Sequence, residues 1–143
     1  MAEEIGRRLR MSNEDIQQIV ALVGQHMRFA DALKMKPSTL KRFMRQPRFA
    51  EHVEMHRIDC LASHGDLTTH DYLRKNLEET RPEEIRPRPL LTGHDLLAMG
   101  YKPGPGFREI LTALEDAQLE GRLSTREQAE ELVRREYPVP ASA

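Results

Sequence analysis

The sequence predicts an all-α protein, with a helical bundle of four to five helices followed by a smaller three-helix segment. Apolar residues recur at steps of three and four along most of the chain, which is the spacing of one helix face. No stretch shows the sustained apolar and polar alternation of a half-buried strand. Residues that start helices, and glycines that end them, punctuate the apolar stripes. Together these three observations favour helices throughout.

The composition excludes several classes of protein. The chain has 143 residues, a formal net charge of -1 and one cysteine, Cys60. No apolar run is long enough for a membrane span, and the N-terminus lacks the apolar block of a signal peptide. A single cysteine cannot form an internal disulfide and fits a reducing compartment. We therefore expect a cytoplasmic protein with no membrane partner.

The first helices are expected in residues 1–80. Residues 2–10 show the last turns of a helix, with Ile5 and Leu9 on one side. Ser12 and Asp15 have the spacing of a capping box, so a second helix should begin there. We expect this helix to end near Gly24, because glycine is a poor interior helix residue.

Three more helices are expected before residue 80. A short basic helix should begin at Pro37 and end before Pro47, since proline is tolerated only in the first turn. The next helix can end in a left-handed glycine, Gly65. A further helix is expected from Leu67 to about Glu79.

Three prolines in residues 81–89 predict a stiff connector, because proline removes N–H donors and favours extended geometry. This connector divides the chain into a helical region, 1–80, and a C-terminal helical tail, 90–143.

The tail should contain three helices. Thr92 and Asp95 are expected to cap the first of them. A longer helix should stop at Gly121. Ser124 and Glu127 have the spacing of a capping box and predict where the third helix begins.

One basic stretch is a candidate for binding nucleic acid. Residues 28–48 hold seven cationic residues and one acidic residue, a local net charge of +6. Lys41, Arg42 and Arg45 fall on one face of the short helix. Closely spaced cations bind phosphate backbones by releasing condensed counterions. The alternative is a solvated surface helix whose cations meet acidic residues elsewhere.

The segment PGPGFREIL, residues 103–111, is a second candidate. Glycines let the backbone approach a ligand, and the start of a helix can hold a phosphate. Lys102 and Arg108 add positive charge. The same residues are equally explained as a tight turn between helices, with proline at the first helical position.

The sequence offers no convincing catalytic group. His52, His56 and Asp59 share one helix face at metal-ligand spacing. We favour hydrogen-bonded or surface histidines and predict no bound metal, because the helix otherwise has a normal solvated face. Glu115 and Asp116 point to neighbouring helix faces and should make no converging acid pair.

Two runs, residues 12–67 and 90–133, resemble the part that follows the catalytic head in bacterial tRNA nucleotidyltransferases of the poly(A) polymerase family. The second run carries the closing pattern G-x-D-L, G-x-x-P-G-P, I-L, G and T-x-E-x-A. The residues at those positions are Gly93, Asp95, Leu96, Gly100, Pro103, Gly104, Pro105, Ile110, Leu111, Gly121, Thr125, Glu127 and Ala129.

The resemblance implies an RNA-binding body and tail. Such enzymes use ATP and CTP, with Mg²⁺ on paired aspartates of the head, to build the CCA end of tRNA or to add adenosines. The chain has no Gly-Ser dipeptide and no D-x-D, so we expect it to grip tRNA without transferring nucleotides or holding a cofactor itself. The expected partners are tRNA and a catalytic head domain or subunit, or a second copy. The expected phosphate contacts are Lys36, Lys41, Arg42, Arg45, Lys102 and Arg108.

Two alternatives of other classes stay open. Uncovered Ile5 and Leu9 would suit a helical interaction module that binds a separate catalytic subunit and no RNA. A metal-dependent phosphohydrolase would instead use His52, His56 and Asp59. Whether the parent enzyme adds CCA, only the terminal A, or poly(A) is not encoded in these residues.

Overall fold

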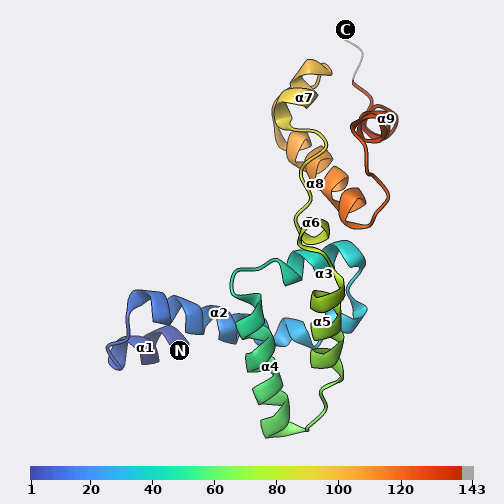
Figure 1. Cartoon of the computed structure of the whole chain (residues 1–143). Helices are drawn as coiled ribbons and strands as arrows, with labels where there is room; N and C mark the ends of the chain where they lie inside the picture. The colour runs from blue at the N-terminus through green and yellow to red at the C-terminus, as the bar shows by residue number, and fades with distance from the viewer. Residues whose placement is uncertain (140–143) are drawn as a thin grey trace. The chain divides into compact units, whose positions relative to one another are not determined.

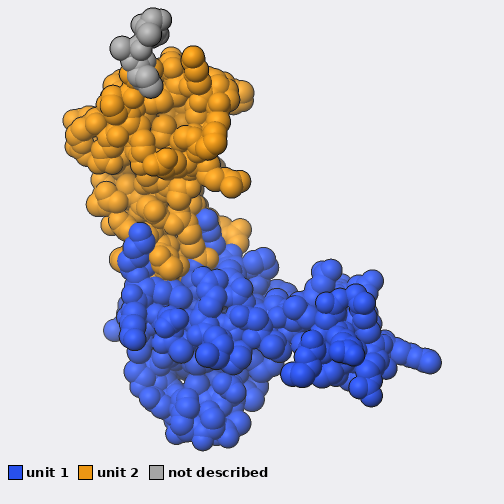
Figure 2. Space-filling model, turned by 180° about the vertical axis from the view of Figure 1, so that it is seen from behind, with its two compact units in different colours: residues 1–36, 43–81 blue, residues 37–42, 82–143 orange. Residues whose placement is uncertain are grey.

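The computed structural model describes residues 1–139, and they are helical without any strand, which confirms the all-α prediction (Figure 1). The chain divides into two compact units (Figure 2). Unit 1 comprises residues 1–36 and 43–81. Unit 2 comprises residues 37–42 and the chain from residue 82 onward. The two ends of one short helix, α3 (Pro37–Met44), therefore belong to different units.

Unit 1 is built from α1 (Ala2–Arg8), α2 (Asn13–Phe29), the 3-10 turn η1 (Ala32–Lys34), the end of α3, α4 (Phe49–Ser63) and α5 (Thr68–Glu79). Ser12 caps α2 as predicted, with its Oγ accepting from the amide of Asp15 at 3.1 Å. Helix α1 folds back along α2 (Figure 1). A Cβ atom at Gly6 would lie 2.7 Å from Cγ1 of Ile16. No side chain larger than hydrogen fits there without moving Ile16.

The predicted end of the second helix at Gly24 is wrong, because α2 continues to Phe29. A glycine inside a helix costs only about 1 kcal/mol relative to alanine. Continuing for another turn places Phe29 in the core, where its side chain is 1% exposed. Burial of one phenylalanine contributes about 1.5–3 kcal/mol, which outweighs the glycine.

Three phenylalanines pack together in the core of unit 1. The rings of Phe29 and Phe43 lie 5.0 Å apart edge to face, and those of Phe43 and Phe49 lie 5.1 Å apart in the same arrangement. His56 stacks on Phe29 with 4.9 Å between ring centroids. The core thus joins α2, the end of α3 and α4 through aromatic contacts.

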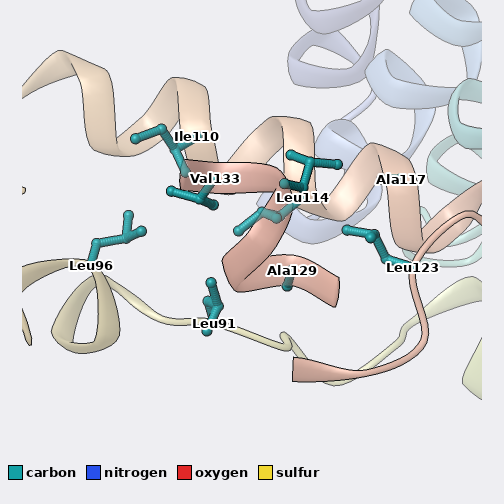
Figure 3. Packing of buried hydrophobic residues seen from close by; sticks show 9 residues of the cluster. Leu91, Leu96, Ile110, Leu114, Ala117, Leu123, Ala129 and Val133 are labelled. Carbon is teal, nitrogen blue, oxygen red and sulfur yellow. The ribbon is translucent and has the colours of Figure 1, made fainter. Parts of the chain in front are cut away.

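Unit 2 contains the start of α3, α6 (Pro82–Ile85), α7 (Gly93–Ala98), α8 (Pro105–Leu119) and α9 (Arg126–Glu136). Its core is aliphatic, with α8 and α9 packing around Leu91 and Leu96 (Figure 3). The buried residues of this core are Leu91, Leu96, Ile110, Leu114, Ala117, Leu123, Ala129, Leu132 and Val133. The three helices expected in residues 90–143 correspond to α7, α8 and α9, and unit 2 also includes the short turn α6 in the proline-rich stretch and the start of α3.

The caps of unit 2 follow the sequence with one correction. Thr92 and Asp95 form the predicted capping box of α7. The box of α9, however, is formed by Thr125 and Gln128, one residue later than the predicted Ser124 and Glu127. Thr125 is the better N-cap because its Oγ1 accepts from the Gln128 amide at 3.3 Å, while the Gln128 side chain accepts from the Thr125 amide.

Gly121 adopts φ +74 just after α8, as predicted for a helix end. Within residues 1–139, none of the helices combines the length and apolar character that a membrane span requires.

Candidate nucleic-acid interface

The first half of the basic helix docks on the C-terminal end of α8, within unit 2. Arg42 donates from Nη2 and Nε to Glu115 Oε2, at 2.7 and 3.1 Å, and from Nη1 to Asp116 Oδ1. Lys41 Nζ donates to the carbonyl oxygen of Leu119 at 2.9 Å. The Oγ of Ser38, which is fully buried, donates to Glu120 at 3.0 Å. Three side chains thus hold residues 37–42 against the end of α8.

The electrostatics of this contact are favourable at both cations. Burial acts to lower the pKa of Arg42, but hydrogen bonds and charge from Glu115 and Asp116 outweigh it and raise that pKa. Lys41 meets the last carbonyls of α8, where the helix dipole favours a positive charge. The expectation that Glu115 and Asp116 do not converge is wrong, because both accept hydrogen bonds from the same guanidinium.

The other predicted phosphate contacts lie elsewhere. Lys36 is exposed and Arg45 half-buried, and both interact with other residues. Lys102 and Arg108 are exposed, and neither makes a hydrogen bond or ion pair with another residue in the range 1–139. Arg108 lies eleven residues before Leu119 on α8, about 16 Å along the helix axis. Within unit 2, Lys41 and Arg42 are therefore held at the opposite end of α8 from Arg108, and contact of the six side chains with RNA stays a prediction.

A groove of about 670 Å³ lies beside α8, wholly within unit 2. One wall is the extended chain of residues 87–93, and the other is one face of α8. The helix face is formed by Phe107, Arg108, Leu111, Thr112, Leu114, Glu115 and Gln118. These positions recur at steps of three and four, so they share one side of the helix.

Gln118 fixes the width of this groove. Its Nε2 donates to the carbonyl oxygen of Arg88 at 2.9 Å, and its Oε1 accepts from the amide of Leu90 at 3.4 Å. The extended wall is therefore hydrogen-bonded to α8 through a single side chain. Leu91 and Leu114, at 2% and 3% exposed, form the base of the groove and belong to the core.

Most polar groups that line the groove are already paired. Thr92 is bound to Asp95 in the capping box, and Glu115 is held by Arg42. The guanidinium of Arg108 and the hydroxyl of Thr112 make no hydrogen bond among the described residues. The groove thus presents an apolar surface with one cation and one hydroxyl.

The histidines of α4 serve the interior of unit 1. His52 is 6% exposed, and burial lowers its pKa. Burial also lowers the pKa of His56, which stacks on Phe29 and lies 3.5 Å from the Sγ of Cys60. Asp59 is exposed, and no three His, Cys, Asp or Glu side chains in residues 1–139 are placed to hold a metal ion. The residues that the structure describes thus lend no support to a phosphohydrolase metal on this face of α4.

Comparison with known proteins shows which family this chain belongs to. Residues 1–132 match the tRNA nucleotidyltransferase domain 2 family. The chain belongs to this family. It is 33% identical over 124 residues to the CC-adding tRNA nucleotidyltransferase of Thermus thermophilus, covering 85% of this chain and 28% of the relative. It is 27% identical over 145 residues to the A-adding tRNA nucleotidyltransferase of Deinococcus radiodurans, covering 94% of this chain and 33% of the relative.

A second A-adding enzyme, from Halalkalibacterium halodurans, is 35% identical over 68 residues, which are 48% of this chain and 16% of the relative. This tRNA nucleotidyltransferase domain therefore spans a third or less of each of these relatives. No solved structure matches the chain.

The pattern residues of the tRNA nucleotidyltransferase resemblance have structural roles. Asp95 caps α7, and hydrogen bonds from Thr92 lower its pKa to about 2. Leu96 and Ile110 are core residues, and Gly121 takes a positive φ. These pattern residues therefore serve the fold of unit 2. They do not indicate whether the exposed cations bind RNA.

Sequence reasoning missed Thr112 and Gln118 as groove residues. Both lie on the helix face of Phe107 and Leu111, at steps of three and four, and that face alternates apolar with polar positions. The spacing itself could have indicated them. The extended chain that faces them could not have been placed from the sequence.

Proposed function

We propose that this chain is the tRNA-gripping part of a tRNA nucleotidyltransferase, which holds tRNA while a catalytic domain extends the 3′ end. The observation that carries the proposal is the family match over residues 1–132. Relatives named as CC-adding and A-adding enzymes both align with the chain, so the shared feature is action on tRNA and not one choice of nucleotide. Mg²⁺, ATP and CTP would then serve the catalytic domain.

The charge distribution supports this proposal. The chain carries 22 lysines and arginines at a net charge of -1, so any RNA contact must be local. In unit 2, Arg88, Lys102 and Arg108 have exposed side chains without a carboxylate partner in the described residues. Such cations can exchange counterions for phosphates without breaking the fold. Lys41 and Arg42 would have to leave existing partners to do the same.

The test is a titration of fluorescently labelled tRNA with the whole chain, followed by anisotropy at two salt concentrations. We expect binding that weakens steeply with salt, because each phosphate contact contributes roughly 0.9 to the slope of log affinity against log salt. Changing Lys102 and Arg108 to Gln should lower that slope by about 2. Absence of binding at low salt would contradict the proposal.

Arg74→Gln is the matched control. Arg74 is also exposed but pairs with Glu78 on α5, at 3.0 Å. Removing its charge should leave the salt slope unchanged. If Arg74→Gln lowered the salt slope as much per charge as the changes at Lys102 and Arg108, RNA binding would depend only on the total charge of the chain.

A second candidate function rests on exposed apolar residues of unit 1. Ile5, Leu9, Val23 and Met27 are 48–68% exposed, and they lie on α1, the residue after it, and α2. Uncovered apolar surface of this kind favours a protein partner, such as a catalytic domain or a second copy. Sedimentation that shows a monomer at high concentration, with no association with a catalytic domain, would count against it.

A further inference from the structure

We propose that the groove beside α8 seats one unstacked base of an RNA, with the adjoining phosphate on Arg108. The proposal rests on the proposed function, because it takes RNA as the ligand. It adds a specific base site to a chain that would otherwise bind RNA only through contacts between its cations and the RNA phosphates. The groove is preformed, which is typical of ligand sites.

The shape of the groove fits a flat ring. Its apolar lining includes the aromatic ring of Phe107, which is half-buried and packs against the core of unit 2. Pro87 and Pro89 line the extended wall at the end of the groove that Gln118 holds. An aromatic ring at one end and rigid proline rings at the other make the lining suited to a base, because a base stacks on an aromatic face.

The unpaired polar groups fit a nucleotide. Arg108 and Thr112 are four residues apart on α8, so their side chains are neighbours, roughly 5–6 Å apart at Cβ. A guanidinium binds a phosphate, and a hydroxyl can donate to or accept from a base edge. Both groups make no hydrogen bond within residues 1–139, so binding need not break an existing contact.

The charges along the groove set the direction in which a nucleotide would lie. Arg108 is near the N-terminal end of the helix face, whereas Glu115 lies two turns later. Glu115 would repel a phosphate although Arg42 pairs with it, and Arg88, whose carbonyl oxygen accepts from Gln118 at that end, is not among the residues that line the groove. The phosphate is therefore assigned to the Arg108 end, and the base to the apolar middle beside Leu111.

The width of the groove is fixed before binding, which reduces the entropy lost on binding. Gln118 ties the extended wall to α8, and the base of the groove is core. A short apolar peptide could use the same depth, but it would bring no anion to pair with the Arg108 guanidinium, whereas an RNA brings a phosphate. This is why RNA is favoured over a protein ligand.

The experiment compares two changes at the groove in the whole chain. Phe107→Leu removes the aromatic ring but keeps apolar volume, and Thr112→Val removes the hydroxyl at equal size. Each is titrated with labelled tRNA and with two short probes, hexauridylate and an abasic hexamer with the same backbone. Tyr137→Leu is the control, because it removes a partly buried ring from the same core outside the groove.

We expect Phe107→Leu to weaken binding of tRNA and of hexauridylate about 5-fold or more, the lower end of the range for losing one stacked base. The salt slope should stay unchanged, because no charge is removed. The abasic hexamer should bind wild type and Phe107→Leu equally. In the wild-type chain, amide resonances of the non-proline residues in 87–93 and 104–118 should shift when hexauridylate is added.

Unchanged tRNA affinity in Phe107→Leu, while the wild-type chain binds, would overturn the base site and leave the proposed function standing. Equal affinity of the wild-type chain for the abasic hexamer and for hexauridylate would also overturn the base site and leave the proposed function standing. Loss of self-association in Phe107→Leu, at unchanged RNA affinity, would assign the groove to a protein contact and overturn the proposal. If wild type bound no tRNA at low salt, the proposed function would fail and the base site with it.

Discussion

Replacing Arg42 by Met tests whether the first half of α3 is a structural part of unit 2. The guanidinium makes three hydrogen bonds to Glu115 and Asp116, and the three side chains are 28%, 34% and 23% exposed. A hydrogen bond to a charged group contributes roughly 1.5–3 kcal/mol when buried, and solvent reduces it strongly at this exposure. We therefore expect Arg42→Met to lower the free energy of unfolding by about 2 kcal/mol in total.

The assay is urea unfolding of the whole chain, followed by tyrosine fluorescence. Two of the three tyrosines, Tyr101 and Tyr137, are in unit 2, so the signal reports mainly on that unit. The midpoint should fall while the slope stays the same. Arg134→Met is the matched control, because Arg134 pairs with Glu130 along the surface of α9 at 3.2 Å. That exposed pair should contribute only about 0.3–0.5 kcal/mol.

Two further measurements separate the pair from other effects of the change. In a double-mutant cycle, Asp116→Asn should lose most of its effect once Arg42 is Met. High salt should reduce the difference in free energy of unfolding between wild type and Arg42→Met only in part, since the ion pair is partly buried. Equal stability of Arg42→Met and Arg134→Met would refute the reasoning, and Arg42 would then be free to act as an RNA contact alone.

The remaining predictions concern a cap and two glycines. Thr92 holds the pKa of Asp95 at about 2, against an ordinary 3.8, so ionised Asp95 stabilises α7 above about pH 3.8 and this stabilisation is lost as the pH falls through about 2. In an acid titration followed by circular dichroism, Asp95→Asn should therefore unfold at a higher pH than wild type. An unchanged midpoint would refute the role of Asp95 as a cap. Gly6→Ala would place a Cβ 2.7 Å from the Cγ1 of Ile16 and should destabilise unit 1 by about 1–2 kcal/mol in thermal unfolding. Adding Ile16→Ala to the same chain should remove this clash. Gly121→Ala, at φ +74, should cost about 1 kcal/mol in the same urea assay, and an unaltered midpoint would count against a strained backbone there.

The sequence predicted the helices of this chain better than their contacts. Local signals such as the Ser12 cap and Gly121 act through neighbouring residues, and both are confirmed. The helix end at Gly24 failed because burial of Phe29, a tertiary effect, outweighed a local preference. The cap at Ser124 failed by one residue, since two adjacent hydroxyl residues compete there and only geometry separates them.

Sequence patterns reveal less about the contacts of the candidate site residues, for a related reason. Phosphate contacts were inferred from positive charge counted along the chain, which cannot reveal a carboxylate that arrives from far away. Glu115 and Asp116 follow Arg42 by 73 and 74 residues, yet they bind it directly. The groove was missed because one wall is extended chain, which carries no periodic signal.

This difference changes how the basic stretch should be interpreted. A local charge of +6 in residues 28–48 invites the conclusion that these residues form the RNA-binding surface. In unit 2, however, Lys41 and Arg42 are bound to the end of α8, where removing them would also weaken the fold. Arg108 has the same charge but no partner among the described residues, so its removal changes only the surface. Loss of RNA affinity on changing Arg42 is therefore weak evidence for a contact unless stability is measured alongside, whereas the same loss on changing Arg108 is direct evidence.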